Sequence, residues 1–349
     1  MFDRPDASPG GHVTMTDKCS TNENKKVDGR KLRRGKRGNY QRRRVDQPGL
    51  FVRYMQLLMA IMEVLDVPVY LSKKSNHIYT CRQKICLLVF RQRLKLSYEQ
   101  FEKDLPNYKN VLNAIGLDTY YPEKSTLCRF ENSLDPSIME AVVNAFKAFC
   151  REKCILAVDG TAFSNFLRSA HFAKRCKDFG IKKEPRSYTK ASLVGDISNH
   201  VVVSARISPF KKHDSTFIPE HTKDLVGMDI SRMVLDKGYD GENIHNHLRS
   251  HLGCVTVIPV RQSRGNRGFS QHGFYRREML RLLVPGGEYQ ETYNQRPQIE
   301  CTNFMIKTHT GSHILARNDV SKENVGLCKV LAHNCKIVCE HDMDWRLRV

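Results

Sequence analysis

The sequence lacks any long hydrophobic run. Its most apolar helical stretch, residues 54–65, contains a glutamate and is too short to cross a bilayer. Residues 1–13 have no apolar core, so we expect no secretory signal there. These two absences favour a cytoplasmic protein over an exported or membrane-spanning one.

Closely paired cysteines are also missing. Twelve cysteines are scattered along the chain, and none occurs as a Cys-x-x-Cys pair. Thiols so distributed, without an export signal, are expected to be reduced in a cytoplasm. A weak zinc candidate consists of His333, Cys335, Cys339 and His341, although the two cysteines fit an apolar helical stripe equally well.

Acidic residues are scarce relative to basic ones. The chain has 57 Lys and Arg against 37 Asp and Glu, which gives a net charge of +20. Residues 1–48 contribute +7 of this and the remainder contributes +13. Such an excess raises affinity for polyanions. We therefore expect nucleic acid as the partner. An anionic membrane surface is the weaker alternative, because we find no basic amphipathic anchor.

The basic charge is densest in the N-terminal segment, 1–48. Nine basic residues and no acid lie between Arg30 and Arg44. Such a run is expected to be disordered in isolation. It is either an arm that follows DNA phosphates, which we favour, or a solvated tail.

Residues 49–149 have a helical pattern of apolar positions. Ser97 with Gln100, Ser125, and Asp135 followed by Pro136 are the expected helix starts. Short helices joined by tight turns are compatible with a helix-turn-helix-like DNA-binding unit. They are equally compatible with any small helical bundle.

From residue 150 to residue 349 the pattern changes to short apolar strands. "CILAVDG" and "SRMVLDKGYD" are apolar runs that end in an acid, and "KASLVGDISNHVVVSARISP" predicts two strands around a turn at Ser198-Asn199. Helical stretches follow, and a final apolar helix begins near Asn324. A hairpin followed by alternating strands and helices predicts an α/β fold with a mixed sheet that helices cover on both faces.

Three acids are the candidate catalytic residues. Asp159 and Asp236 follow apolar strands, and in open α/β sheets sites form at the carboxyl ends of strands. Glu300 stands near the start of a predicted helix. Hard cations such as Mg²⁺ take carboxylate ligands, and two such ions can catalyse phosphoryl transfer. However, three acids can always be chosen from 37, and an Asp after a strand is often a turn former or helix cap.

Basic residues surround Glu300 at helical spacing. On a helix, Glu300 and Lys307 point within roughly 20° of each other, and Arg296 would lie about 40° away. Pro297 suits only the first helical turn, so the helix is expected to begin near it. Arg296 and Lys307 would then hold a phosphate backbone beside the acids.

These residues resemble the DDE transposases of prokaryotic insertion sequences. The resemblance is carried by "VDGT" at Asp159, "LDKGYD" at Asp236, and a Y-x2-R-x3-E-x6-K block formed by Tyr293, Arg296, Glu300 and Lys307. That block is similar to the Tyr–Arg–Glu–Lys signature of one branch of the family. "HDS" at His213 also matches, where the histidine either lines the site or, as we favour, caps a helix.

The resemblance implies a ribonuclease H-like catalytic domain and a transposase activity. Asp159, Asp236 and Glu300 would bind two Mg²⁺ ions, for which Mn²⁺ can substitute. The enzyme would cut DNA at terminal inverted repeats and join the 3′-hydroxyls to target DNA. Contacts to double-stranded DNA would come from Tyr293, Arg296 and Lys307. The family implies a homodimer on paired ends, which places the protein at the nucleoid.

Two other functions remain open from the sequence. One is a non-catalytic DNA-binding protein derived from a transposase, although all three acids are present. The other is a ribonuclease H-like nuclease without strand transfer, in which the Tyr–Arg–Glu–Lys block would have no purpose.

Overall fold

The computed structural model describes residues 49–74, 76–165, 175, 178–180, 187–261 and 273–341. All of them belong to one compact unit, Pro48–Val349. The predicted basic tail, 1–48, lies outside the described residues. Every helix of the described part is too short or too polar to span a bilayer. The described cysteines form no disulfide with one another.

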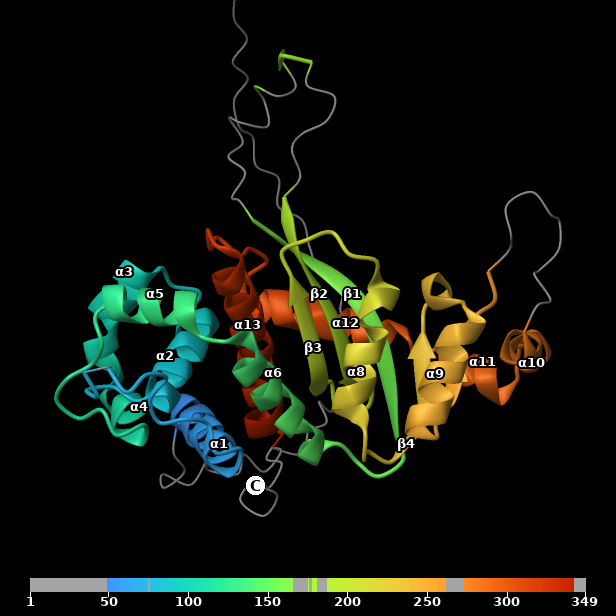
Figure 1. Ribbon diagram of the computed structural model, residues 1–349, viewed down its shortest axis with the longest axis horizontal. Helices are drawn as coiled ribbons and strands as arrows, with labels where there is room; N and C mark the ends of the chain where they lie inside the picture. The colour runs from blue at the N-terminus through green and yellow to red at the C-terminus, as the bar shows by residue number, and fades with distance from the viewer. Residues whose placement is uncertain are drawn as a thin grey trace, which may run out of the picture. The chain divides into compact units, whose positions relative to one another are not determined.

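The first part of the described chain is helical, as predicted (Figure 1). It consists of α1 (Leu50–Val64), α2 (Cys81–Leu94), α3 (Tyr98–Asp104), η1 (Leu105–Tyr108), α4 (Lys109–Ala114), α5 (Lys124–Ser133), α6 (Pro136–Ala145) and η2 (Phe146–Phe149).

Two of the predicted helix starts are confirmed. At the start of α6, Asp135 Oδ1 accepts a hydrogen bond from the backbone N–H of Ser137 at 2.9 Å, and Pro136 is the first helical residue. At the start of α3, Ser97 Oγ accepts from the N–H of Gln100 at 3.2 Å. Each cap satisfies a backbone donor that has no partner within its helix.

The prediction that Ser125 caps a helix is wrong. Helix α5 begins one residue earlier, at Lys124, and Glu123 is its N-cap. The N–H of Lys124 donates to Glu102 Oε1 of α3 at 2.9 Å. A distant side chain therefore satisfies this first-turn donor, and Ser125 lies inside the helix.

The second part of the described chain contains a mixed five-stranded sheet, which confirms the α/β prediction. Its strands are β1 (Cys154–Ser164), β2 (Tyr188–Asp196), β3 (Val202–Ser208), β4 (Ile230–Leu235) and β5 (Val255–Val257), in the order β3-β2-β1-β4-β5. β1, β2 and β3 are joined in antiparallel pairs, whereas β4 is parallel to both β1 and β5.

The predicted turn at Ser198-Asn199 joins β2 to β3. Asp196 Oδ1 accepts from the N–H and the hydroxyl of Ser198, at 2.8 and 2.7 Å. Asn199 Oδ1 accepts from the N–H of Val201 at 2.9 Å. These side chains satisfy the turn backbone and so set the register of the hairpin.

Helices connect and cover the sheet (Figure 1). After β3 come η3 (Asp214–Phe217), α8 (Ile218–Leu225), η4 (Lys237–Tyr239), α9 (Glu242–Leu252), α10 (Phe274–Leu282), α11 (Glu288–Tyr293), α12 (Pro297–Thr310) and α13 (Asp319–Glu340). Helix α12 packs on β1 and β2, and α8 packs on β3.

The last helix, α13, is shared by both halves of the described chain. It packs against α1, α2, α5 and α6 on one side and against β3 on the other (Figure 1). Its Gly326 lies so close to β3 that an added Cβ would be 2.8 Å from Ile207 Cγ2. Buried residues of the helical region, the sheet and α13 form one continuous core. The domain division at 49–149 and 150–349 stays a prediction.

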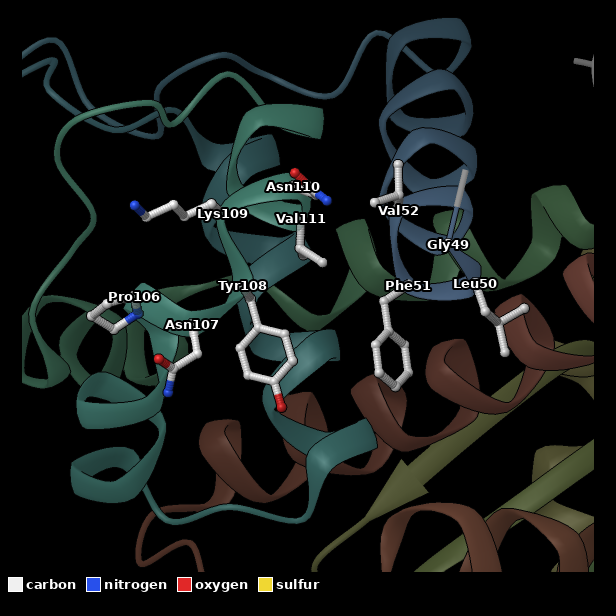
Figure 2. Close-up of a pocket in the computed structure, with 10 residues that line it drawn as sticks. All are labelled: Gly49, Leu50, Phe51, Val52, Pro106, Asn107, Tyr108, Lys109, Asn110 and Val111. Atoms are coloured by element: carbon white, nitrogen blue, oxygen red, sulfur yellow. The ribbon is translucent and has the colours of Figure 1, made fainter. Parts of the chain in front are cut away.

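A cavity of about 710 Å³ lies in the helical region, between the start of α1 and the η1–α4 segment (Figure 2). Phe51 and Tyr108 line it from opposite sides. Its lining residues, Gly49–Val52 and Pro106–Val111, include no acid. The candidate catalytic acids therefore have to be sought elsewhere in the fold.

Candidate active site

The two predicted aspartates lie on adjacent parallel strands. The last paired residues of β1 and β4 are Val158 and Leu235, and Asp159 and Asp236 follow them directly. Asp236 therefore follows the end of its strand, as predicted, whereas Asp159 lies inside β1, which continues beside β2 to Ser164. The prediction that Asp159 ends a strand is wrong, although both aspartates stand where the parallel pairing of β1 and β4 stops. Asp236 also caps η4 by accepting a hydrogen bond from the N–H of Lys237 at 2.8 Å.

The alternation of the strands turns both aspartates toward the same face. Side chains two residues apart share a face of a sheet. Asp159 therefore shares a face with Ala157, and Asp236 shares a face with Val234. Ala157 and Val234 pack in a small core cluster with Ile299 of α12. Both carboxylates consequently face the helix that carries the predicted glutamate.

Helix α12 begins at Pro297, where the sequence predicted it. Arg296 is its N-cap residue and Glu300 lies in its first turn. Tyr293 ends the preceding short helix, α11, so it belongs to a separate element. The spacing of four residues lets the Arg296 guanidinium donate a hydrogen bond to Glu300 Oε1.

Arg296 lies among all three candidate acids. Its Nη1 is 3.7 Å from Asp159 Oδ1 and its side chain is only 17% exposed. Burial alone would lower the pKa of Arg296. The pKa is nevertheless raised, because the negative charges of Glu300, Asp236 and Asp159 outweigh burial. The guanidinium thus acts as the counter-ion of the three acids.

Asp159 is more enclosed than Glu300. Its side chain is 22% exposed, whereas that of Glu300 is 53% exposed. Burial raises the pKa of Asp159, while the Arg296 charge and a hydrogen bond from Asn303 oppose that rise. Asn303 Nδ2 donates to Asp159 Oδ2 at 2.9 Å. The protein therefore stabilises the ionised form of an acid that burial disfavours.

Tyr293 and Lys307 flank the acids. Burial and the charges of Asp236 and Glu300 raise the pKa of Tyr293, so its phenol is protonated at neutral pH. Burial lowers the pKa of Lys307, whereas the nearby charge of Asp159 raises it. Lys307 Nζ lies 5.8 Å from the ring centre of Phe163 in β1. Electrostatic interactions thus connect all six predicted residues.

The histidine of "HDS" caps a helix, as predicted. His213 Nδ1 accepts a hydrogen bond from the N–H of Ser215 at the start of η3. The next residue, Asp214, forms an ion pair with Lys190 of β2 at 2.9 Å. Its carboxylate lies so close to Gly160 that a Cβ there would overlap it. A glycine after Asp159 is therefore required by packing against Asp214.

Gly160→Ala is expected to destabilise the protein by about 1–3 kcal/mol, the usual cost of overpacking. The added methyl would displace the Asp214 carboxylate from Lys190. The double variant Gly160→Ala/Asp214→Ala should recover most of this loss, measured as the free energy of unfolding in urea. Gly238→Ala is the control, because its Cβ would lie 3.7 Å from the nearest side-chain atom, Asp236 Oδ2. Equal destabilisation by both alanines would contradict the predicted overlap.

Comparison with known proteins identifies the family. The sequence profile of the transposase DDE domain matches residues 151–335, more than half of the chain. The chain belongs to the transposase DDE domain family. It is also similar to a solved structure, a cryo-EM structure of piggyBac transposase in a synaptic complex with hairpin DNA. The TM-score is 0.43 at 10% identity, over 87% of this chain and 77% of that one. A search of curated proteins found no match.

DDE transposases generally use divalent metal ions, and the donor set here fits a hard cation. Three carboxylates come from β1, the end of β4 and the first turn of α12, and oxygen ligands of this kind suit such ions. Asn303 Oδ1 is a buried acceptor beside them, without a hydrogen-bond partner among the described residues. In the described part of the chain, however, no three His, Cys, Asp or Glu side chains are close enough to hold a metal ion. The site is arranged around Arg296 instead.

The weak zinc candidate is wrong, because three of its four side chains are completely buried in the packing of α13 and no metal-binding cluster forms there within the described chain. His333 is fully buried, and its Nε2 lies 2.9 Å from the carbonyl oxygen of His200. Cys335 and Cys339 are buried in the apolar face of α13. Their spacing reflects helix packing, the alternative that the sequence left open.

Sequence reasoning missed Asn303. It lies on α12 one turn after Glu300 and contacts an aspartate 144 residues away in the sequence. Its position three residues after the glutamate was the one available signal, since residues at that spacing share a helix face.

A buried lysine holds the far end of the helix that carries Glu300. Lys329 of α13 is 2% exposed, and its Nζ donates to the carbonyl oxygens of Thr310 and Gly311 at 2.5 and 3.1 Å. These carbonyls end α12 and lack partners within the helix. Burial lowers the pKa of Lys329 from 10.5 to about 7. A neutral amine still has two protons to donate, so both contacts survive deprotonation.

The low pKa of Lys329 predicts a pH-dependent stability. Between about pH 7 and 10.5 the unfolded lysine binds a proton that the native one lacks. The free energy of unfolding should therefore rise with pH in this window, by up to about 1.4 kcal/mol per unit. Urea unfolding at pH 7 to 9 would measure this rise. The free energy of unfolding of the wild type minus that of Lys329→Met should increase with pH, because methionine does not titrate. A constant difference would refute the prediction.

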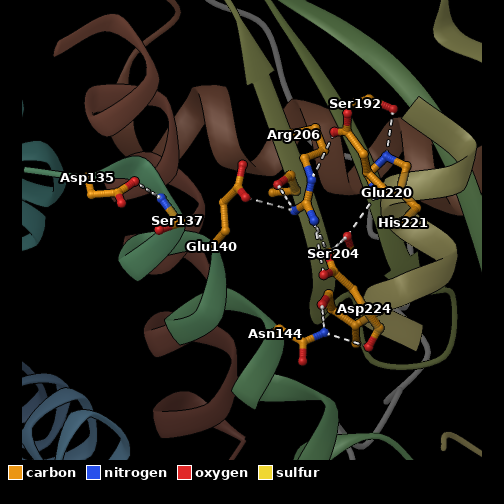
Figure 3. Close-up of polar contacts among 12 residues, drawn as sticks. Asp135, Ser137, Glu140, Asn144, Ser192, Ser204, Arg206, Glu220, His221 and Asp224 are labelled. Atoms are coloured by element: carbon orange, nitrogen blue, oxygen red, sulfur yellow. Dashed lines mark hydrogen bonds and ion pairs between the residues drawn. The ribbon is translucent and has the colours of Figure 1, made fainter. Parts of the chain in front are cut away.

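A second polar cluster surrounds Arg206 on the other side of the sheet hairpin (Figure 3). Arg206 forms ion pairs with Glu140, Glu220 and Asp224 at 3.4, 3.2 and 2.9 Å. His221 lies between two serine hydroxyls of β2 and β3, at 2.9 and 2.7 Å.

Hydrogen bonds connect Ser192, His221, Ser204 and Asp224 in a chain, but these residues do not form a nucleophilic catalytic site. Ser192 and His221 are completely buried, so no substrate can reach them. Burial lowers the pKa of His221 to about 3, which keeps the ring neutral. The cluster joins β2 and β3 to α8 and α6, and its role is structural.

Proposed function

We propose that the chain is a DNA transposase of a prokaryotic insertion sequence, in the branch with the Tyr–Arg–Glu–Lys signature. It would cut element ends at terminal inverted repeats and join the 3′-hydroxyls to target DNA. The observation that carries the proposal is the position of Arg296, whose guanidinium pairs with both Asp159 and Glu300 and senses the charge of Asp236. The three acids come from positions far apart in the sequence, and their grouping around one guanidinium supports a common role.

Asp159, Asp236 and Glu300 would hold two Mg²⁺ ions, or Mn²⁺ in their place. When bound, such ions activate an attacking oxygen and stabilise a leaving one in phosphoryl transfer. The protein's own contribution is to orient the carboxylates through β1, β4 and α12. Because Arg296 is held by these carboxylates, it would have to separate from Glu300, the most exposed of them, before a cation could bind between them.

Tyr293, Arg296 and Lys307 would contact the phosphates of double-stranded transposon-end DNA. Their location beside the acids and the net charge of +20 support this role. We further propose a ribonuclease H-like catalytic domain, 150–349, a helical DNA-binding domain, 49–149, and a basic tail, 1–48. The protein would act as a homodimer on paired ends, at the nucleoid in the cytoplasm.

Cleavage of labelled element-end DNA tests the proposal. The DNA that flanks the gene supplies the substrate, because its short terminal inverted repeats define the ends. Wild-type protein should cut this DNA in Mg²⁺, and Asp236→Ala should bind it without cutting. Absence of cutting by the wild type in both Mg²⁺ and Mn²⁺ would favour a non-catalytic DNA-binding protein.

A strand-transfer assay with pre-cut ends separates a transposase from a nuclease. The proposed enzyme should join the 3′-hydroxyl of a pre-cut end to a supercoiled target. Cutting without joining would favour a ribonuclease H-like nuclease.

A further inference from the structure

The side chain of Asn303 links the strand aspartate, Asp159, directly to the helix that carries Glu300. It lies on α12, one turn beyond Glu300, and is 6% exposed. Its Nδ2 donates to Asp159 Oδ2 at 2.9 Å. Asp159 Oδ1, the other oxygen, lies on the side of Arg296, at 3.7 Å from Nη1. One oxygen of the Asp159 carboxylate therefore accepts a hydrogen bond from an amide, and the other lies beside a guanidinium.

The direction of this hydrogen bond follows from chemistry. An ionised carboxylate only accepts, so the amide must turn its nitrogen toward Asp159. That orientation leaves Asn303 Oδ1 buried and without a hydrogen-bond partner among the described residues. A buried acceptor without a partner is unfavourable, and it persists here at the edge of the acid site. Stability alone does not explain the amide at this position.

Packing of α12 on the sheet does not depend on Asn303. Ile299 is 1% exposed, and its Cδ1 lies 3.0 Å from the position of a Cβ at Gly195 of β2. Ile306 is completely buried on the same helix. Thr302 shares a hydrogen bond with His200 at 3.0 Å. These contacts fix the helix, so the amide of Asn303 is available for another purpose.

We propose that Asn303 is a positioning residue for the metal-binding carboxylate of Asp159. It holds Oδ2 and so fixes the rotation of the carboxylate, which leaves Oδ1 directed at the cation site between Asp159 and Glu300. This inference rests on the proposed function, since it assumes that Asp159 binds a divalent ion. Partners that orient metal ligands in this way typically change metal affinity by about 10–100-fold when they are removed.

Binding of Mn²⁺ to the full-length, metal-free protein tests this role without any DNA chemistry. Asn303→Leu keeps the shape of the side chain and removes its donor. We expect it to weaken Mn²⁺ binding tenfold or more, measured by titration with electron paramagnetic resonance detection. Affinity for element-end DNA without metal should change less than threefold. A structural defect would lower both affinities together.

Asn334→Leu is the matched control. Asn334 is a completely buried amide on α13 that bonds the backbone of Val202, away from the acids. Its substitution should lower the thermal midpoint of unfolding at least as much as Asn303→Leu does, and leave Mn²⁺ affinity unchanged. Combining Asn303→Leu with Asp159→Asn should weaken Mn²⁺ binding no more than Asp159→Asn alone, because Asn303 acts through Asp159.

The outcomes separate this inference from the proposed function. If Asp159→Asn weakens Mn²⁺ binding and Asn303→Leu does not, the role of Asn303 is refuted and the proposed function stands. If Asp159→Asn also leaves Mn²⁺ binding unchanged, the proposed metal site fails and the role of Asn303 fails with it. Additive losses in the double variant would likewise refute a role exerted through Asp159.

Discussion

Asp159→Cys and Asp236→Cys are each expected to lose cleavage of element-end DNA in Mg²⁺ by about 10³-fold and to regain part of it in Mn²⁺. A bound metal contributes several kcal/mol of transition-state stabilisation. About 4 kcal/mol corresponds to a factor of 10³ in rate. Sulfur is a poor ligand for Mg²⁺ and a better one for softer ions. Cleavage rates in each metal, with DNA affinity as a second measurement, would test this expectation.

Glu291→Cys is the control for the thiol itself. Glu291 is an exposed acid of α11, close in sequence to the signature block but not among the predicted ligands. Its substitution should leave the rate in both metals within about twofold of the wild type. Reducing conditions are needed because Cys301, next to Glu300, is exposed. Full activity of either aspartate variant in Mg²⁺ would remove that residue from the metal site.

Arg296→Gln is expected to change metal and DNA binding in opposite directions. In the metal-free protein the guanidinium neutralises Asp159 and Glu300, so a divalent cation competes with it for the same carboxylates. Without that positive charge, Mn²⁺ should bind several-fold more tightly. Loss of one phosphate contact should weaken DNA binding and reduce the slope of log affinity against log salt by about 1. Titrations with Mn²⁺ and with DNA at several salt concentrations would measure the two effects.

Lys322→Gln is the corresponding control. Lys322 is 18% exposed and pairs locally with Asp319 at the start of α13, at 2.8 Å. Removal of this local pair should leave Mn²⁺ affinity unchanged. Weaker Mn²⁺ binding by Arg296→Gln would mean that the guanidinium supports the metal site and does not compete with the ion.

The sequence predicted those features that depend on local periodicity. Short apolar runs and turn residues placed β1, the hairpin at Ser198-Asn199 and β4, because the length of an apolar run and turn chemistry are local properties. Pro297 marked the start of α12 for the same reason. From these elements it follows that Asp159 and Asp236 lie on neighbouring strands, where the parallel pairing of β1 and β4 stops.

Long-range side-chain contacts were beyond reach of the sequence. Ser125 was a reasonable cap by spacing, but Glu102 supplies the partner that lets α5 begin earlier. Spacing predicted that Arg296 and Glu300 would lie on nearly the same side of the helix, yet it gave no sign that Asp159 would share the Arg296 guanidinium. Asn303 was invisible because its partner is on another element. Such contacts depend on how β1 and α12 pack, which no local pattern encodes.

Because α13 is the last helix of the described chain, the core can be completed only late in synthesis. This last helix completes the core of the first helices and also supports β3. While α13 is still inside the ribosome, the nascent chain would expose the apolar surfaces of the N-terminal helices and of β3 on which α13 later packs. A chain truncated before Asn318 should therefore be digested rapidly by proteases, and no stable fragment of it should accumulate.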